Sequence, residues 1–369
     1  MRVATILGTR PEVIKLAPVV GELRRRPETE CVLVATGQHR EMVDQMLEQF
    51  GLQADVDLGV MQPEQRLSDL TSELMRGLGR TLAELEPDWV LVQGDTTTTL
   101  CGALTAFYES VPVAHVEAGL RSGDDRSPFP EEANRRLVAG LTELHLCPTP
   151  GSAANLVAES VPHDRIRVTG NTVIDALLWA VERAQGLPAP VPRTRPRRIL
   201  LTLHRRESHG EAMRNVCQVV RAIARRGDTE VVFPVHRSPA VRQVVLPALA
   251  SVEAVHLCEP LDYLDLVHVL DSCDLVLTDS GGLQEEAPAL GKPVLVLRDT
   301  TERPEAVAAG VARLVGTAPH VVHAAVTTLL DDRRAYEAMA HPENPFGDGH
   351  ASPRVVSALA EGHVARRAA

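Results

Sequence analysis

Aromatic residues are scarce in this sequence: Phe, Trp and Tyr together make up 3% of its 369 residues. Proteins that hold nucleic acids by base stacking need aromatic side chains, and proteins that read the phosphate backbone need a basic surface. The formal net charge here is −11 at pH 7. We therefore expect no nucleic-acid partner, although a few local cations would suffice to bind a mononucleotide.

Paired cysteines and long apolar runs are also lacking. The six cysteines are scattered and form no Cys-x-x-Cys pair, so buried free thiols are expected rather than a disulfide framework or a zinc site. No apolar run approaches the ~20 residues of a membrane span, and the opening segment MRVATILG is too short for a signal-peptide core. We expect a cytoplasmic protein with no membrane partner.

What the sequence does have is an alternation of short apolar runs and helix-like stretches. The runs are apolar along their length, which is typical of parallel strands covered on both faces, and the alternation favours a doubly wound α/β fold. The predicted strands of the first half are 3–7, 32–35, 89–93, 113–116, 144–147 and 166–168, and those of the second half are 199–202, 231–233, 255–257, 275–278 and 294–297. Predicted helices in the first half include 41–50, 67–85 and 97–108.

These two series predict two Rossmann-like domains, and the length suits two domains of ordinary size. The proline-rich stretch 186–196 is expected to be a surface loop before the first strand of the second domain, with the hinge near Gly170 and Asn171. Ser352 and Pro353 are typical of a helix start, with a capping hydroxyl and a proline in the first turn. Ligands of such sheets bind beyond the carboxyl ends of the strands, so we expect the chemistry in a cleft between the domains.

The clearest motif follows the strand 275–278, where Ser280, Gly281 and Gly282 lead into a helix. Such a turn presents backbone N–H groups at the positive end of a helix dipole, and glycine lets a diphosphate approach closely. Glu286, one turn into the helix, could accept hydrogen bonds from a ribose diol. The alternative is a tight turn that needs glycine for its backbone alone.

Candidate cations follow two other strands. Arg10 and Lys15 come after the first strand, and Arg303 follows the strand 294–297. Such cations could neutralise a diphosphate, or they could be ordinary surface charges at a helix start.

A set of carboxylates also lies at successive strand ends: Asp95, Glu117 and Glu131. Adjacent parallel strands would bring Asp95 and Glu117 together on one rim of the sheet. Carboxylates crowded in a dry cleft have separated pKa values, which suits them to take and return protons. The alternative is that they are solvated loop acids.

Two histidines of the second half, His204 and His236, also follow strands. Each could contact a phosphate or a leaving group, or be structural. No second ligand lies at a suitable spacing, so neither predicts a metal site.

Together these motifs resemble the non-hydrolysing UDP-N-acetylglucosamine 2-epimerases. The resemblance covers nearly the whole chain, in order, and several of its motifs are long enough to be specific. Its motifs are residues 8–12 (GTRPE), 38–40 (QHR), 94–99 (GDTTTT), 115–121 (HVEAGLR), 130–132 (PEE), 170–172 (GNT), 204–207 (HRRE), 280–282 (SGG), 298–304 (RDTTERP) and 344–349 (NPFGDG).

The resemblance implies a glycosyltransferase-B-like fold and a reaction without a cofactor. An N-terminal domain, 1–169, would carry the catalytic carboxylates, a C-terminal domain, 170–351, would bind UDP, and the last helix, 352–369, would pack back onto the first domain. The reaction would interconvert UDP-GlcNAc and UDP-ManNAc by eliminating UDP to a 2-acetamidoglucal and adding it back. A homodimer is expected from the family alone.

The resemblance also implies roles for individual residues. The catalytic set would be Asp95, Glu117, Glu131 and His204. The UDP-binding set would be Arg10, Lys15, His204, Leu266, Ser280, Gly281, Gly282, Glu286 and Arg303. A second substrate molecule that activates the enzyme would be held by Gln38, His39, Arg205 and Glu207.

Two alternatives share this architecture: a hydrolysing 2-epimerase that releases ManNAc and UDP, and a glycosyltransferase that uses a UDP-sugar. A non-enzymatic sensor of UDP-sugars would not need the full carboxylate set.

Overall fold

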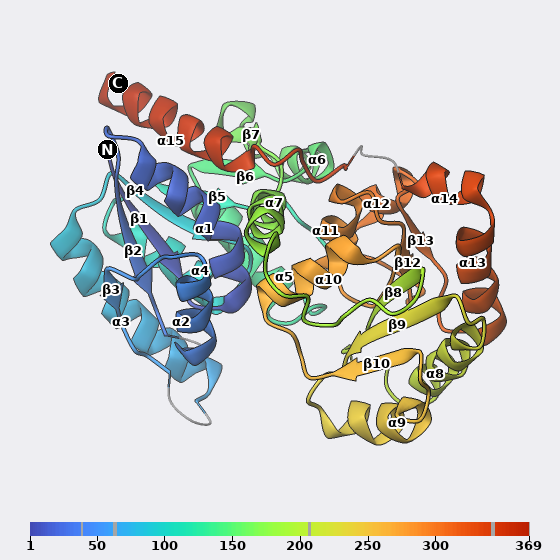
Figure 1. Ribbon diagram of the computed structural model, residues 1–369. Coiled ribbons are helices and arrows are strands. Elements are labelled where there is room, and N and C mark those ends of the chain that lie inside the picture. Colours follow the sequence, from blue (N-terminus) through green and yellow to red (C-terminus); the bar gives the residue numbers. More distant parts are fainter. Residues whose placement is uncertain (38–39, 62–64, 206–207, 341–343, 369) are drawn as a thin grey trace. The chain divides into compact units, whose positions relative to one another are not determined.

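The computed structural model describes residues 1–37, 40–61, 65–205, 208–340 and 344–368. Its contacts divide into two units: unit 1 comprises Met1–Ala176 and Phe346–Ala369, and unit 2 comprises Leu177–Pro345. Each unit is a parallel sheet flanked by helices (Figure 1). The predicted α/β class with two Rossmann-like domains is therefore confirmed.

Within the described residues, the sheet of unit 1 has seven parallel strands in the order β3-β2-β1-β4-β5-β6-β7. Every residue of β4, β5 and β6 is buried, which explains why these strands read as continuous apolar runs. The strands are β1 (Arg2–Leu7), β2 (Glu30–Ala35), β3 (Val56–Asp57), β4 (Trp89–Gln93), β5 (Val113–Val116), β6 (Leu144–Cys147) and β7 (Ile166–Val168).

The helices of unit 1 cover this sheet in two groups. Contacts join α1 to α2 and α15, and a second series joins α3, α4 and α5. The helices are α1 (Arg10–Arg25), α2 (Arg40–Gln49), α3 (Leu67–Leu85), α4 (Thr97–Tyr108), α5 (Glu131–Leu141), α6 (Pro150–Ala158), α7 (Thr172–Ala184) and α15 (Ala351–Ala368), with a 3₁₀ turn at His163–Arg165.

The C-terminal helix α15 belongs to unit 1 and is capped by a residue far away in sequence. The carboxylate of Asp175 accepts the backbone N–H groups of Ala351 (3.1 Å) and Ser352 (2.7 Å). The Ser352 hydroxyl, which we expected to cap this helix, is buried and makes no hydrogen bond within the described residues. The helix begins at Ala351, so Ser352 lies inside its first turn rather than at the N-cap, and the cap comes from Asp175 of α7.

The first division between the units falls after Ala176, a few residues beyond the expected hinge. The backbone N–H of Asn171 donates to the carbonyl of Phe346 (2.7 Å), and both residues belong to unit 1. This hydrogen bond and the Asp175 cap hold the start of α7 and the segment before α15 together. As a result, α7 begins in unit 1 and ends in unit 2.

Unit 2 repeats the same plan. Within the described residues, its six parallel strands have the order β10-β9-β8-β11-β12-β13. The strands are β8 (Arg197–Thr202), β9 (Thr229–Pro234), β10 (Val255–Cys258), β11 (Leu275–Thr278), β12 (Val294–Val296) and β13 (Ala312–Leu314). The helices are α8 (Glu211–Ala224), α9 (Pro239–Leu249), α10 (Tyr263–Ser272), α11 (Leu283–Ala289), α12 (Pro304–Ala308), α13 (Pro319–Asp331) and α14 (Arg333–Met339).

Both sheets reverse their strand order at one point. In unit 1 this switch lies between β1 and β4, and in unit 2 between β8 and β11. Ligands of doubly wound sheets bind beyond the carboxyl ends of the strands at such a switch point. The loops that begin at Gly8 and Gly94 in unit 1, and at Leu203 and Asp279 in unit 2, are therefore where a site is expected.

Candidate functional site

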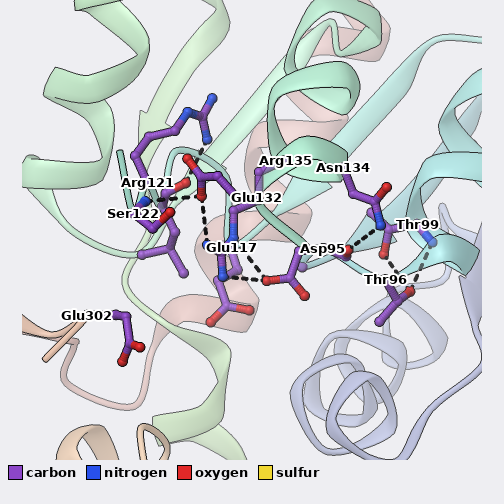
Figure 2. Close-up of polar contacts among 12 residues, drawn as sticks. Asp95, Thr96, Thr99, Glu117, Arg121, Ser122, Glu132, Asn134, Arg135 and Glu302 are labelled. Carbon is purple, nitrogen blue, oxygen red and sulfur yellow. Dashed lines mark hydrogen bonds and ion pairs between the residues drawn. The ribbon is translucent and has the colours of Figure 1, made fainter. Parts of the chain in front are cut away.

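Asp95 and Glu117 follow two neighbouring strands of unit 1 (Figure 2). In the register of β4 and β5, Gln93 lies opposite Val116, so the residues that follow lie on the same rim of the sheet. A Cβ atom added to Gly94 would lie 3.6 Å from Oε2 of Glu117, which shows how closely the Glu117 carboxylate approaches the loop of Asp95. The structure thus brings these two sequence-predicted carboxylates together.

The Asp95 carboxylate is held by Arg135 of α5. The guanidinium of Arg135 contacts Oδ2 of Asp95 through both Nε (2.9 Å) and Nη2 (2.6 Å). Asn134, also on α5, donates its side-chain amide to the backbone carbonyl of Asp95 (2.8 Å). Burial works against the charge on Arg135, but Asp95 and Glu132 outweigh it and raise the pKa of the guanidinium. The arginine therefore remains a permanent cation beside Asp95.

Glu132 is a buried carboxylate whose importance the sequence did not reveal. Its side chain is fully buried, and Oε2 accepts hydrogen bonds from Nη1 of Arg135 (2.9 Å) and from the backbone N–H of Ser122 (3.0 Å). It therefore ties the loop after β5 to α5 and completes the setting of Arg135. The only sequence signal is its place next to Glu131 in the PEE motif.

Glu117 adopts a left-handed backbone conformation, with φ of 64°, directly after β5. Its carboxylate contacts the Lys15 ammonium and the side-chain amide of Gln93, and it accepts a hydrogen bond from the side chain of Asn171 (3.3 Å). The side chain of Glu117 is only 5% exposed. A non-glycine residue with positive φ is rare, and such strain is often found at functional sites.

Lys15 was expected near a diphosphate, whereas the structure shows its ammonium on Glu117. The position of Lys15 on α1 was apparent from the sequence, but its partner was not. An ammonium group has three donors, so this contact leaves the expected role of Lys15 possible. Arg10, the first residue of α1, is partly exposed.

Glu131, the third expected carboxylate, is the first residue of α5. Its Oε2 is buried and has no hydrogen-bond partner within the described residues. Asp95 and Glu117 both have cationic partners, so Glu131 differs from them in having an unsatisfied oxygen. Buried polar atoms without partners are rare and occur at functional sites.

Glu12 connects the loop after β1 to the start of α4. Its Oε2 accepts from the backbone N–H groups of Gly8 (2.8 Å) and Thr9 (2.7 Å), and its Oε1 accepts from the Thr96 hydroxyl (2.6 Å). Burial raises the pKa of Glu12, although these hydrogen bonds oppose the shift. Glu12 thereby fixes Gly8 and Thr9, which precede Arg10, against the loop that carries Asp95.

His115, on β5 two residues before Glu117, contacts the loop that carries Asp95. Its Nε2 lies 2.7 Å from the carbonyl of Gly94, and its Nδ1 is buried without a partner in the described chain. Burial lowers the pKa of His115 to about 4 and that of its neighbour His145, on β6, to about 3. Both rings are therefore neutral at pH 7, and His115 donates from Nε2 to Gly94.

In unit 2, the turn 280–282 follows β11 as expected, and Gly282 is the N-cap of α11. Gly282 has φ of −62° and ψ of −45°, so its backbone conformation does not require glycine. A Cβ atom added to Gly281 would meet only the Arg205 guanidinium, at 3.7 Å, and one added to Gly282 would lie 3.6 Å from a Glu286 oxygen. The glycines therefore leave open space above the turn, and backbone need does not explain them.

Around this turn lie other expected residues. Glu286 is largely buried, and the Tyr263 hydroxyl donates to its Oε1 (3.5 Å). Leu266, one turn further along α10, is partly exposed. Arg303, the N-cap of α12, contacts the buried carboxylate of Glu285 through Nε. Tyr263 and Glu285 had not been expected from the sequence.

His204 and Arg205 follow β8 and share a buried partner, Asp279. Nδ1 of His204 lies 3.0 Å from Oδ1 of Asp279, and the backbone N–H of Arg205 donates to Oδ2 (2.9 Å). The Arg205 guanidinium also contacts Glu302 (3.2 Å). Burial alone would raise the pKa of Glu302, but the hydrogen bond from Arg298 and the charges of Arg205 and Arg298 lower it to about 2.

Three of the four residues expected to hold an activating molecule, Gln38, His39 and Glu207, lie outside the described residues, and only Arg205 is described. Among the described residues, no group of three or more His, Cys, Asp or Glu side chains could hold a metal ion. In the same part of the chain, no helix has both the length and the apolar character needed to cross a membrane.

Comparisons with known proteins identify the family to which this chain is similar. Residues 21–360 match the sequence model of a family described as UDP-N-acetylglucosamine 2-epimerase. The chain is 49% identical to the UDP-N-acetylglucosamine 2-epimerase of Escherichia coli K12 over 99% of this chain and 100% of that protein.

Solved structures give the same result. The crystal structure of UDP-GlcNAc 2-epimerase from Neisseria meningitidis bound to UDP-GlcNAc is 46% identical, with a TM-score of 0.90 and coverage of 98% of this chain and 100% of that chain. The Methanocaldococcus jannaschii enzyme in complex with UDP-GlcNAc and UDP is 33% identical, with a TM-score of 0.81 and the same coverage. The family model, the full-length identity and the fold all agree, and the chain therefore belongs to the UDP-N-acetylglucosamine 2-epimerase family.

Proposed function

We propose that this protein is a non-hydrolysing UDP-N-acetylglucosamine 2-epimerase, which interconverts UDP-GlcNAc and UDP-ManNAc. The observation that carries the proposal is the pairing of Asp95 with Arg135 and of Glu117 with Lys15 at neighbouring strand ends. Carboxylates that are held by cations keep a fixed orientation, as a group that removes a proton from carbon must. Family membership supplies the substrate class.

The chemistry requires two kinds of help at once. Carbon 2 of the sugar has no adjacent carbonyl group, so its proton is not acidic. Cleavage of the bond between carbon 1 and the diphosphate oxygen develops positive charge on the ring, and loss of the carbon 2 proton then forms the double bond of the 2-acetamidoglucal. The departing diphosphate needs donors and cations, while the proton needs a carboxylate.

Inversion follows when UDP adds back to carbon 1 and a proton is delivered to the opposite face of carbon 2. We assign Asp95, Glu117 and Glu131 to the proton transfers, since Asp95 and Glu117 follow β4 and β5 at the carboxyl edge of the unit 1 sheet and Glu131 begins α5, the next helix after β5. We assign the diphosphate to the turn 280–282, Arg10, Lys15, His204 and Arg303. Glu286 and Leu266 would contact the ribose and the uracil.

The glycine turn supports the assignment of the diphosphate. Neither Gly281 nor Gly282 has a positive φ, and the space that their missing side chains leave is bordered by Arg205, Ser280 and Glu286. Glycine at such a position is explained by the close approach of a ligand to the backbone. The reaction involves no net oxidation or reduction, since UDP adds back to carbon 1 and a proton from the enzyme replaces the one removed from carbon 2, so no redox cofactor is needed.

Product analysis distinguishes this function from its nearest alternative. Incubation of the enzyme with UDP-GlcNAc in water, followed by proton NMR, is expected to give a stable mixture of UDP-GlcNAc and UDP-ManNAc. Accumulation of free ManNAc and UDP would instead establish a hydrolysing enzyme. Loss of UDP-GlcNAc only when a sugar acceptor is added would establish a glycosyltransferase.

We further propose that the protein is a cytoplasmic homodimer. All six cysteines are free thiols, which suits a reducing compartment. Phe107 and Tyr108 at the end of α4 are 58% and 67% exposed, and Leu137 on the adjacent helix α5 is 57% exposed. Apolar side chains gathered on neighbouring helices support a contact with a second copy. Light scattering should give twice the monomer mass, and Phe107→Asp should shift it toward the monomer.

A further inference from the structure

Asp279 and His204 lie on the two sides of the switch point of unit 2. β8 pairs with β11 so that Thr202 lies opposite Thr278; His204 follows two residues after Thr202, and Asp279 directly follows Thr278. At this point Nδ1 of His204 is 3.0 Å from Oδ1 of Asp279. The pair therefore stands where a doubly wound sheet receives its ligand.

Asp279 is fully buried, and every contact given for its carboxylate is with a donor. Besides Nδ1 of His204, it accepts the backbone N–H groups of His204 (3.0 Å) and Arg205 (2.9 Å) and the hydroxyl of Ser208 (2.8 Å). Burial opposes ionisation of Asp279, but the hydrogen bond and charge of His204 and the other donors outweigh it, and its pKa lies below the usual value. An ionised carboxylate only accepts hydrogen bonds, so Nδ1 of His204 must carry a proton.

The other nitrogen of the ring is available to a ligand. Within the described residues, Nε2 of His204 has no hydrogen-bond partner, and the side chain is 44% exposed. Its neighbours with charge or titratable protons are Arg205, paired with Glu302, and His236, whose ring centroid is 6.4 Å away. Among these groups, Asp279 provides the negative charge in direct contact with the ring.

We propose that Asp279 is a positioning residue for His204: it fixes a proton on Nδ1 and the orientation of the ring, so that the Nε2–H of the protonated ring donates to the departing diphosphate. The proposal rests on the function proposed above. As the bond between carbon 1 and oxygen breaks, its electron pair stays on the oxygen of the β-phosphate, and the imidazolium hydrogen bond strengthens with that charge. No proton needs to transfer, and the same hydrogen bond is present when UDP adds back.

The variant Asp279→Asn tests this role because it nearly keeps the shape of the side chain. The amide oxygen can still accept from Arg205 and Ser208, but the amide nitrogen would face His204, so Nδ1 could no longer hold a proton there. The imidazole would then be neutral. We expect kcat to fall by ~10²-fold or more while KM changes little, as when the carboxylate that orients a catalytic histidine is replaced by its amide.

A matched control lies at the other end of the same strand. Asp274 precedes β11 and accepts the backbone N–H of Arg198 (2.8 Å) and the guanidinium of Arg193 (2.7 Å). Asp274→Asn makes the same chemical change at a similarly bonded aspartate, and it should leave kcat within about threefold of the wild type, as for a change remote from the site. An equal loss of kcat in both variants would show that Asp279 acts only on the fold.

A second measurement does not depend on turnover. NMR of protein labelled with ¹⁵N in histidine, with the His204 signals assigned from their absence in His204→Gln, should show a proton on Nδ1 of His204 in the wild type and its loss from Nδ1 in Asp279→Asn. A proton that stays on Nδ1 in the variant would overturn the proposal. If the wild type failed to epimerise UDP-GlcNAc, the proposed function would fail, yet this spectrum would still decide whether Asp279 fixes that proton.

A double-mutant cycle separates positioning from folding. If Asp279 acts through His204, adding Asp279→Asn to His204→Gln should cause little further loss of kcat. Independent, multiplicative losses would contradict the proposal, and so would wild-type kcat in Asp279→Asn. Thermal melting of each variant, with and without UDP, would show whether a loss of kcat comes from failure to fold.

Discussion

The Lys15 ammonium contacts the carboxylate of Glu117, and both side chains are largely buried, at 17% and 5% exposure. Lys15 is on α1 and Glu117 follows β5, so 102 residues separate them in the chain. The pair lies beside the switch point of unit 1. Breaking such a buried pair leaves a charge without its partner, which costs far more than the loss of an exposed ion pair.

Lys15→Met is therefore expected to lower kcat by ~10-fold or more and to move the acidic limb of its pH profile to higher pH. Without the ammonium group, the ionised form of Glu117 loses its neighbouring positive charge, so more of the carboxylate is protonated at a given pH. The sequence contains one other lysine, Lys292, which provides a matched control. Equal pH profiles for Lys15→Met and Lys292→Met would show that Lys15 has no effect on Glu117.

Arg135 should matter as much as the carboxylates that it contacts. Arg135→Met removes the cation that holds Asp95, and it leaves Glu132 with only the Ser122 N–H and a longer contact with Arg136 (3.7 Å). We expect kcat to fall by ~10²-fold, as for loss of an oriented acid or base. Arg136→Met, at the next and more exposed position on α5, does not touch Asp95 and should have a smaller effect; similar losses at both positions would indicate damage to α5 or to Glu132 rather than to Asp95.

Gly282→Ala should impair binding without impairing folding. The added methyl group would meet only the ends of the Glu286 and Ser280 side chains, at 3.6 and 3.9 Å, and the backbone is already α-helical. If a diphosphate approaches the turn, however, that methyl group occupies its space, and KM should rise by ~10-fold or more, equivalent to about 1.4 kcal/mol. Calorimetric titration with UDP measures the change directly.

Gly291→Ala supplies the opposite pattern as a control. Gly291 has φ of 64°, so a side chain there strains the backbone and should cost about 1 kcal/mol of stability while leaving KM unchanged. Normal UDP affinity in Gly282→Ala would remove the turn from the binding site.

Stability should fall as the pH drops from about 6.5 toward 4 because of His115 and His145. Burial lowers their folded-state pKa values from 6.5 to about 4 and about 3. Between the folded and unfolded pKa values, the unfolded chain binds more protons, so acidification favours the unfolded chain and the native state loses stability. Each histidine contributes roughly 2 kcal/mol of loss at pH 5.

Urea unfolding at pH 7 and pH 5 tests this expectation. His115→Gln can keep a donor to Gly94 but cannot be protonated, so its stability should fall less between the two pH values than that of the wild type. His350→Gln changes an exposed histidine and should behave like the wild type. The same loss in all three proteins would assign the pH dependence to other groups.

Much of the fold could be predicted from the sequence because its strands are parallel and the central ones are buried along their length. The predicted limits of β4, β5, β6, β7 and β11 agree with the structure, as do those of α3 and α4. Two edge strands, β3 and β13, had not been predicted. β3 has only two residues, and β13 has an exposed Arg313 at its centre, so neither shows the apolar run that marks a covered strand.

The site was predicted less completely, for a physical reason. A strand end can be located from local sequence, so Asp95, Glu117 and the turn 280–282 could be found as candidates. Their partners depend on how distant elements pack. Lys15 contacts Glu117, Arg135 holds Asp95, and Asp279 contacts His204. Each of these contacts joins residues distant in the sequence, so no local pattern predicts it.

Epimerisation in D₂O tests the central claim most directly, because it asks whether a proton at carbon 2 is exchanged by the carboxylates of unit 1. The wild type should place one deuterium at carbon 2 of the UDP-sugars, with no acceptor present. Glu117→Gln should slow this exchange by ~10²-fold or more while UDP binding is largely retained. Epimerised product without deuterium at carbon 2, or exchange at the wild-type rate in both Glu117→Gln and Asp95→Asn, would contradict the account.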